Sequence, residues 1–159
     1  MAQFEKYHPI LTAHYTLDWL TKARAIDVQT LDQQATSTTV ALTTTAAQIN
    51  QTMRLIFRDQ QLIWGVTNRT TDQFVGRVGF APIDLHNHQA TLIVDLLADA
   101  QTTATWTELY QRLVAFATAE LQLKVLTVNL TSANPELEAI LTRLGFTPSD
   151  QGHYQLLTS

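Results

Sequence analysis

The hydrophobic period of the sequence changes after Gln61, and this change requires a fold in which helices pack against a sheet. From Ala46 to Gln61, apolar residues recur at intervals of three and four, which predicts an amphipathic helix. After it, Leu62 to Thr67 and Phe74 to Phe80 have the composition of strands, joined by a polar run that suits a hairpin loop. A helix followed by a hairpin indicates a fold of the α/β (α+β) class.

The second half of the chain alternates strands with helices. Near-continuous apolar residues from Ala90 to Leu97 predict a strand that is buried on both faces. The remaining predicted elements are a long helix from Trp106 to Leu121, a strand from Val125 to Leu130, a short helix between Asn134 and Gly145, and a last strand from Tyr154 to Leu157. Strands joined through a helix are expected to run parallel and hairpin-linked strands antiparallel, so the sheet should be mixed.

The N-terminal third is predicted to be mainly helical. Apolar residues from Thr16 to Gln34 lie at spacings close to one helical face, with a break near Asp27 as the alternative to one continuous helix. The segment from Thr36 to Thr45 is rich in threonine, whose branched side chain disfavours a helix interior, so we expect a loop or a short extended segment. Later in the chain, Thr105 and Glu108 have the spacing of a capping box at a helix start.

Length and composition favour one domain over residues 1–159. The sequence contains no cysteine, which excludes disulfides, thiolate metal sites and cysteine nucleophiles. The net charge is −4, and the ten Lys and Arg residues are scattered along the chain, which argues against nucleic-acid binding. No leader and no segment of membrane-spanning length is evident, so we expect no membrane contact and a cytoplasmic location.

Two segments carry characteristic motifs. The first, WGVTNRTTDQFVGRVGF (Trp64 to Phe80), contains Gly76 and Gly79 inside a strand, where glycine is unfavourable unless a bulge or a close backbone approach requires it. The second runs from Ala90 to Phe146 and ends in LTRLGF. In order and spacing, the two resemble the GNAT superfamily, in particular its ribosomal-protein-alanine N-acetyltransferase branch. This resemblance implies the GNAT fold, with a splayed, mixed and mostly antiparallel sheet flanked by helices.

The resemblance also implies a cleft for acetyl-CoA between two strands that part. The pantetheine arm would pair with the main chain near Leu96, Leu97 and Ala98. The pyrophosphate would lie on the N-terminus of the next helix, where unpaired amides and the helix dipole favour an anion. The residues that the resemblance assigns to this region are Thr102, Thr103, Ala104, Thr105, Trp106, Thr107 and Asn134. The position of Asn134 before Pro135 is equally explained by a structural role as N-cap of the last helix.

The pyrophosphate loop departs from the family pattern. Family members usually have two glycines there, whereas this chain has Thr102 and Ala104 at the matching positions. Two interpretations follow: threonine hydroxyls donate to phosphate in place of the lost backbone contacts, or Thr105 and Glu108 cap the helix for themselves. Cofactor binding therefore depends on whether the helix presents free amide hydrogens to a diphosphate.

The family's catalytic side chains are also replaced. A glutamate that acts as general base in many members corresponds to Thr91, and a tyrosine that acts as general acid corresponds to Leu141. Asp95 shares a strand face with Thr91, which makes it the candidate base. The alternative for Asp95 is a structural ion pair or hydrogen bond, for instance with Arg77.

The resulting hypothesis is an acetyl-CoA-dependent N-acetyltransferase whose acceptor is a primary amine of a small molecule or of a protein N-terminus. The amine would attack the thioester directly, with the enzyme supplying orientation. The alternatives are a catalytically inactive GNAT-like binding or interaction module, and a structural partner that forms a homodimer. No metal is expected, because His86 and His88 have chelating spacing but no evident third ligand. Tyr110 and Tyr154 receive no role, since most buried tyrosines only satisfy one hydrogen bond.

Overall fold

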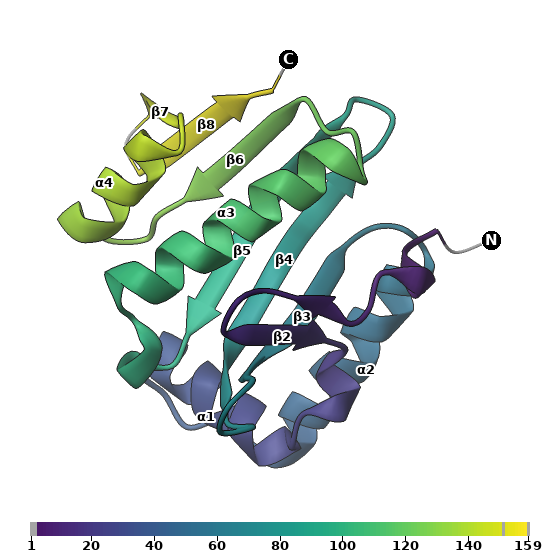
Figure 1. The fold of residues 1–159 in the computed structure, drawn as a ribbon. Coiled ribbons are helices and arrows are strands. Elements are labelled where there is room, and N and C mark those ends of the chain that lie inside the picture. Colours follow the sequence, from purple (N-terminus) through teal and green to yellow (C-terminus); the bar gives the residue numbers. More distant parts are fainter. Residues whose placement is uncertain (1–2, 151, 159) are drawn as a thin grey trace.

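The computed structural model describes residues 3–150 and 152–158, which form one eight-stranded sheet with helices on its faces (Figure 1). The strands are β1 (Ile10–Leu11), β2 (Tyr15–Asp18), β3 (Leu62–Asn68), β4 (Phe74–Asp84), β5 (Gln89–Leu96), β6 (Val125–Asn129), β7 (Thr147–Asp150) and β8 (His153–Leu157). They lie in the order β1-β2-β3-β4-β5-β6-β8-β7. β5 and β6 pair in parallel, and the other neighbouring strands pair antiparallel. The predicted mixed, mostly antiparallel sheet is therefore confirmed.

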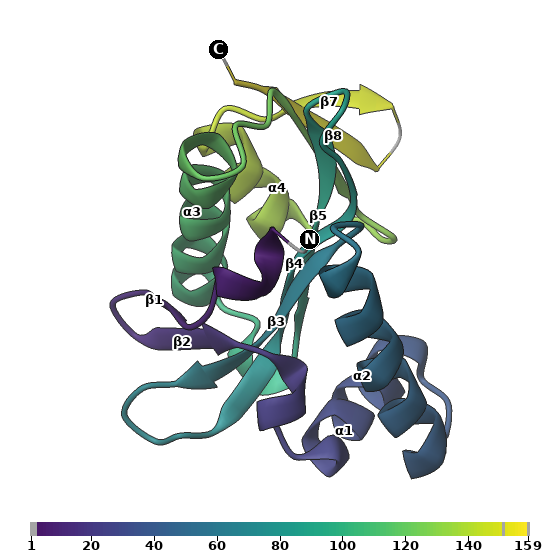
Figure 2. The same cartoon turned by 90° about the vertical axis from the view of Figure 1, so that its right-hand side faces the viewer.

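Helices cover both faces of this sheet. The α-helices are α1 (Ala25–Thr36), α2 (Leu42–Phe57), α3 (Thr103–Ala119) and α4 (Pro135–Arg143), and the 3-10 helices are η1 (Phe4–Lys6), η2 (Leu20–Lys22) and η3 (Ala98–Ala100). α3 and α4 lie on one face of the sheet and α1 and α2 on the other, as two perpendicular views show (Figures 1 and 2). Within the described ranges, no helix is long and apolar enough to cross a membrane.

Two apolar clusters hold the layers together. Between the sheet and α3, the buried rings of Trp64 and Phe116 meet edge to face, with 5.3 Å between their centroids. The indole N–H of Trp64 donates to the Tyr7 carbonyl oxygen at 2.7 Å, so the polar atom of this core residue is satisfied. On the other face, a smaller cluster that includes Ile63 and Leu31 packs under α1 and α2. The centre of the sheet is thus covered on both sides.

Gly76 and Gly79 of β4 each lie at a close approach between strands. A Cβ atom on Gly76 would lie 2.4 Å from the Asp95 carbonyl oxygen, and one on Gly79 would lie 2.0 Å from the Leu62 carbonyl oxygen. Gly79 also has a φ of +153°, which side chains of L-residues rarely adopt. The glycines of the family motif therefore allow β4 to fit between β3 and β5.

The prediction of a helix from Thr16 to Gln34 is wrong in its first part. Residues Tyr15–Asp18 form β2, η2 follows, and α1 begins only at Ala25. Leu17 pairs with Val66 of β3 and is fully buried. Because a few apolar residues fit both one helical face and one face of a strand, pairing with β3 decides the local conformation.

The segment from Thr36 to Thr45 is partly helical, contrary to the prediction of a loop. α2 begins at Leu42, with no side-chain cap. Thr45 is fully buried, and burial of this helix face outweighs the weak helix propensity of threonine. The helix predicted from Ala46 to Gln61 is therefore present, but it lies about one turn nearer the N-terminus.

Candidate active site

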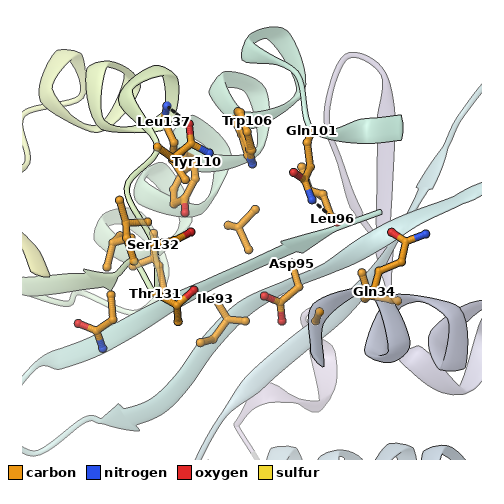
Figure 3. Close-up of a pocket in the computed structure, with 18 residues that line it drawn as sticks. Gln34, Ile93, Asp95, Leu96, Gln101, Trp106, Tyr110, Thr131, Ser132 and Leu137 are labelled. Carbon is orange, nitrogen blue, oxygen red and sulfur yellow. Dashed lines mark hydrogen bonds between the residues drawn. The ribbon is translucent and has the colours of Figure 1, made fainter. Parts of the chain in front are cut away.

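β5 and β6 part after a short parallel pairing, and a cavity opens between them. The pairing joins residues 89–91 of β5 to residues 125–127 of β6. The cavity measures about 300 Å³ and is bounded by β5, β6, α1, α3 and the start of α4 (Figure 3). Ile93 and Asp95 lie at this cavity and are partly exposed, so the prediction that β5 is buried on both faces is wrong. The splayed sheet that the resemblance implied is confirmed.

Two main-chain groups that face the cavity, at the end of β5 and the start of η3, already have partners. The Leu97 N–H donates to the Val75 carbonyl oxygen of β4. Because neighbouring residues of a strand direct their main-chain groups to opposite edges, the N–H and carbonyl of Leu96 point away from β4, toward the cavity. The Leu96 carbonyl oxygen accepts from the Gln101 side chain at 3.0 Å (Figure 3). The Ala98 N–H donates to the side-chain oxygen of Gln34 at 2.8 Å. The three residues predicted to contact pantetheine thus lie together, and the two glutamines were not predicted.

α3 begins three residues earlier than the predicted capping box would place it. Thr102 is its N-cap, and the Thr102 hydroxyl oxygen accepts from the Thr105 N–H at 3.2 Å. The capping-box prediction for Thr105 and Glu108 is therefore wrong, although the helix does cap itself. The first-turn N–H groups of Thr103 and Ala104 have no acceptor among the described residues.

Glu108 instead ties the β1–β2 hairpin to α3. Its carboxylate accepts hydrogen bonds from the Thr12 hydroxyl and from the His14 N–H, the latter at 2.8 Å, and it contacts His14 Nδ1 at 2.6 Å. Burial of the carboxyl raises the pKa of Glu108, but these hydrogen bonds outweigh burial, so the pKa lies below its ordinary value. Nearby, the Tyr15 hydroxyl lies 2.8 Å from the Thr105 hydroxyl oxygen. The N-terminal half of α3 is therefore fixed to the N-terminal strands.

The other residues assigned to the pyrophosphate region differ in their surroundings. The Thr103 hydroxyl donates to the carboxylate of Glu136, an exposed residue in the first turn of α4. Trp106 is buried and lines the cavity, whereas Thr107 is not among the lining residues. A carboxylate thus lies at the N-terminus of α3, where the resemblance places an anion, and the sequence analysis did not single it out.

Asp95 forms the ion pair that the sequence left open as the alternative, and it does so at the wall of the cavity. Its side chain lines the cavity and is 41% exposed. One carboxylate oxygen also lies 3.3 Å from an Arg77 guanidinium nitrogen, and Arg77 in turn contacts the buried Asp32 of α1 at 2.9 Å. The ion pair with Arg77 is therefore present, and it holds Asp95 at the wall of the cavity.

Tyr110 of α3 is the buried polar group of the cavity that the sequence analysis set aside. Tyr110 is 2% exposed, and its hydroxyl points into the cavity, opposite Asp95 (Figure 3). The hydroxyl makes no hydrogen bond to a described residue. Burial, and secondarily the charge of Asp95, raise the pKa of Tyr110 well above its usual range. The phenol stays protonated, so it is a hydrogen-bond donor to whatever enters the cavity. Its spacing of four residues from Trp106 on one helical face is the signal that marks it.

The geometry of this cleft agrees with a sequence comparison. The sequence model of the family described as acetyltransferase (GNAT) domain matches residues 15–147. The chain belongs to the GNAT acetyltransferase family. No curated protein matches this GNAT chain in sequence.

Solved structures share the GNAT fold with this chain. A protein described as a ribosomal-protein-serine acetyltransferase of Vibrio cholerae is 17% identical, with a TM-score of 0.75 over 94% of this chain and 97% of that chain. The spermidine N-acetyltransferase of Vibrio cholerae, solved with CoA and spermine, is 14% identical, with a TM-score of 0.73 over 90% and 95%. The microcin C7 self-immunity acetyltransferase, solved with acetyl-CoA and AMP, is 17% identical, with a TM-score of 0.68 over 92% and 93%. At these identities the likeness shows the fold.

Asn134 lies where the GNAT cleft meets α4. Its side-chain oxygen accepts from the Leu137 N–H at 3.1 Å, and Pro135 follows as the first residue of the helix. Asn134 and Leu137 also line the cavity. The N-cap role predicted as the structural alternative is therefore present, at a position that borders the cleft.

The two histidines of the β4–β5 turn are both exposed. His86 and His88 flank Asn87, whose N–H and side chain donate to Asp84. Over residues 3–150 and 152–158, no group of three His, Cys, Asp or Glu side chains is placed to hold a metal ion.

Proposed function

We propose that this GNAT protein transfers the acetyl group of acetyl-CoA to a primary amine of a small molecule or of a protein N-terminus. The observation that carries the proposal is the open cavity where β5 parts from β6. A cleft between splayed strands, with main-chain groups on one wall and a helix N-terminus at its mouth, suits a long ligand that has amides and a diphosphate. Structural neighbours solved with CoA or acetyl-CoA support the same ligand.

In this proposal, the pantetheine arm and the pyrophosphate of acetyl-CoA each have a counterpart in the chain. The main chain from Leu96 to Ala98 pairs with the pantetheine arm, and the free N–H groups of Thr103 and Ala104 take the pyrophosphate. The Trp106 side chain forms an apolar wall between these two regions. The cavity wall and the adjacent N-terminus of α3 therefore offer complementary groups for both polar parts of the ligand.

The transfer step uses two polar side chains that line the cavity, Asp95 and Tyr110. The amine nitrogen forms a bond to the acetyl carbon, the carbon–sulfur bond breaks, and sulfur leaves with the electron pair. Asp95 accepts the proton that nitrogen loses, and the Tyr110 hydroxyl donates a hydrogen bond to the departing sulfur. Arg77 holds Asp95 in position through the observed ion pair.

Calorimetric titration with acetyl-CoA tests the proposal, followed by an assay of thiol release in the presence of primary amines. We expect binding heat and amine-dependent release of CoA. A titration without heat would remove the proposal and favour the inactive binding module instead. The observation in favour of that alternative is that side chains of Gln34, Gln101 and Thr102 already bond main-chain groups of the cleft.

A further inference from the structure

Two glutamine side chains occupy the main-chain edge that faces the cleft at the end of β5 and at Ala98, the first residue of η3. Gln101 donates to the Leu96 carbonyl, and Gln34 accepts from the Ala98 N–H. A carbonyl at one residue and an N–H two residues later are the groups that a single residue of a parallel neighbouring strand engages. β6 is that neighbour at the start of β5, but it has parted from β5 before this point. The glutamines thus supply the donor and the acceptor that a continued strand would supply.

Both glutamines are placed so that they are able to leave this edge. Gln34 belongs to α1 and lies 64 residues before Ala98, and Gln101 lies between η3 and α3. Both are exposed, so each side chain exchanges a bond to the main chain for bonds to water when it swings out. The net free energy of such a bond is small because water competes for both partners. The main chain of β5, in contrast, is held by its pairing with β4.

We infer that Gln34 and Gln101 form an amide lock, which competes with the pantetheine arm of CoA for the edge of β5 and sets the affinity of the cleft. The inference rests on the proposed function, because pantetheine is the amide-bearing chain that acetyl-CoA lays along this edge. Pantetheine contains two amides, so the N–H of one and the carbonyl of the other replace both glutamine contacts. Each released bond lowers the affinity by roughly fivefold, the equivalent of one ordinary hydrogen bond.

Two substitutions that change the charge equally, but affect the lock oppositely, test this inference. Gln101→Glu removes the N–H donor and sets a carboxylate against the Leu96 carbonyl, so the side chain leaves the edge. Gln34→Glu keeps an acceptor for the Ala98 N–H and strengthens that bond, since a charged acceptor binds more strongly than a neutral one. Pantetheine, which carries no phosphate and no net charge, is the probe. We expect roughly fivefold tighter binding to Gln101→Glu, and weaker binding to Gln34→Glu than to the wild type.

Gln111→Glu is the matched control, because Gln111 is an exposed glutamine of α3 outside the cavity lining. We expect this control to bind pantetheine as the wild type does. Shifts of the same sign in Gln34→Glu and Gln101→Glu would overturn the amide lock, as would weaker or absent pantetheine binding by Gln101→Glu. If Gln101→Glu binds pantetheine more tightly than the wild type while neither protein binds acetyl-CoA, the lock stands and the proposed acetyl transfer fails.

Discussion

Replacing Gly76 with alanine tests how the β4–β5 pair positions the cleft. Gly76 pairs with Leu96, the last residue of β5. An added Cβ would lie 2.4 Å from the Asp95 carbonyl oxygen, 2.7 Å from Leu96 Cδ2 and 3.0 Å from Leu96 Cα. Two of these atoms belong to the backbone, so a change of rotamer cannot relieve the contact, and β5 must move away from β4.

The expected cost of Gly76→Ala is about 2 to 3 kcal/mol of the free energy of unfolding. Overpacking a well-packed site costs roughly 1–3 kcal/mol, and contact with backbone atoms places this variant near the upper end. Alanine also restricts the unfolded chain, which offsets roughly 0.4–1 kcal/mol where the backbone conformation is compatible. Because the movement of β5 carries Leu96 with it, the affinity for CoA should fall together with the stability.

Urea denaturation of the wild type, Gly76→Ala and Gly65→Ala measures the loss in the free energy of unfolding that each substitution causes. Gly65 of β3 is the matched control, because its added Cβ would meet side-chain atoms of Leu20 and Phe74 at 3.2 and 3.3 Å, and side chains are able to give way. We expect Gly65→Ala to stay within about 1 kcal/mol of the wild type. Equal losses of stability in the two variants would refute the reasoning, since contact with backbone would then cost no more than contact with side chains.

Three further substitutions test the site. Tyr110→Phe keeps the buried ring and removes the donor, so we expect kcat to fall by roughly tenfold or more at unchanged KM and unchanged Tm, and an unaltered kcat would exclude Tyr110 from the transfer step. Glu136→Gln removes a negative charge beside the free N–H groups of α3, so acetyl-CoA should bind more tightly in calorimetry at low salt, with a smaller gain at high salt. Glu108→Gln should destabilise the protein at pH 7. Because the folded-state pKa of Glu108 is lowered, the contribution of its carboxylate is present above the ordinary value of 4.5 and is lost as the pH falls through the folded pKa. Urea denaturation should therefore show a smaller difference in the free energy of unfolding between Glu108→Gln and the wild type at pH 3 than at pH 7. A difference that does not change with pH would contradict this account.

The elements that the sequence predicted well are those with a long apolar period or a clear cap. The hairpin of β3 and β4 and the helix α4, with its N-cap Asn134, follow from local pattern alone. β1 and β2 span only two and four residues, too few to show a strand period, so the pairing of β1 with β2 and of β2 with β3 was hidden. β7 was not predicted, because it contains Pro148 and proline argues against a central strand. It lies at the edge of the sheet, where a strand tolerates proline.

The candidate site was predictable in its main chain but not in its side chains. The family resemblance assigned Leu96 to Ala98 and Thr102 to Thr107 to one site, and these segments lie near one another because the helix follows closely after the strand. The contact of Gln34 with Ala98 spans 64 residues and has no periodic signature. The contact of Thr103 with Glu136 likewise depends on how α4 docks beside α3. Such partners are set by the packing of elements, which local pattern does not encode.

Hydrogen bonds between the chain's own side chains and the main chain of the cleft are compatible with acetyl-CoA binding. The side chains of Gln34 and Gln101 bond main-chain groups that the pantetheine arm would use. At about 1 kcal/mol each, their displacement costs about 2 kcal/mol, or roughly 30-fold in Kd. Such a cost lowers affinity but does not abolish binding, because a ligand is able to replace a side-chain hydrogen bond but cannot enter a cavity that is filled with atoms. The cavity of about 300 Å³ stays open with both bonds in place. Weak binding that strengthens when the lock is removed is therefore the expected behaviour, and calorimetry at high acetyl-CoA concentration separates it from an inert cleft.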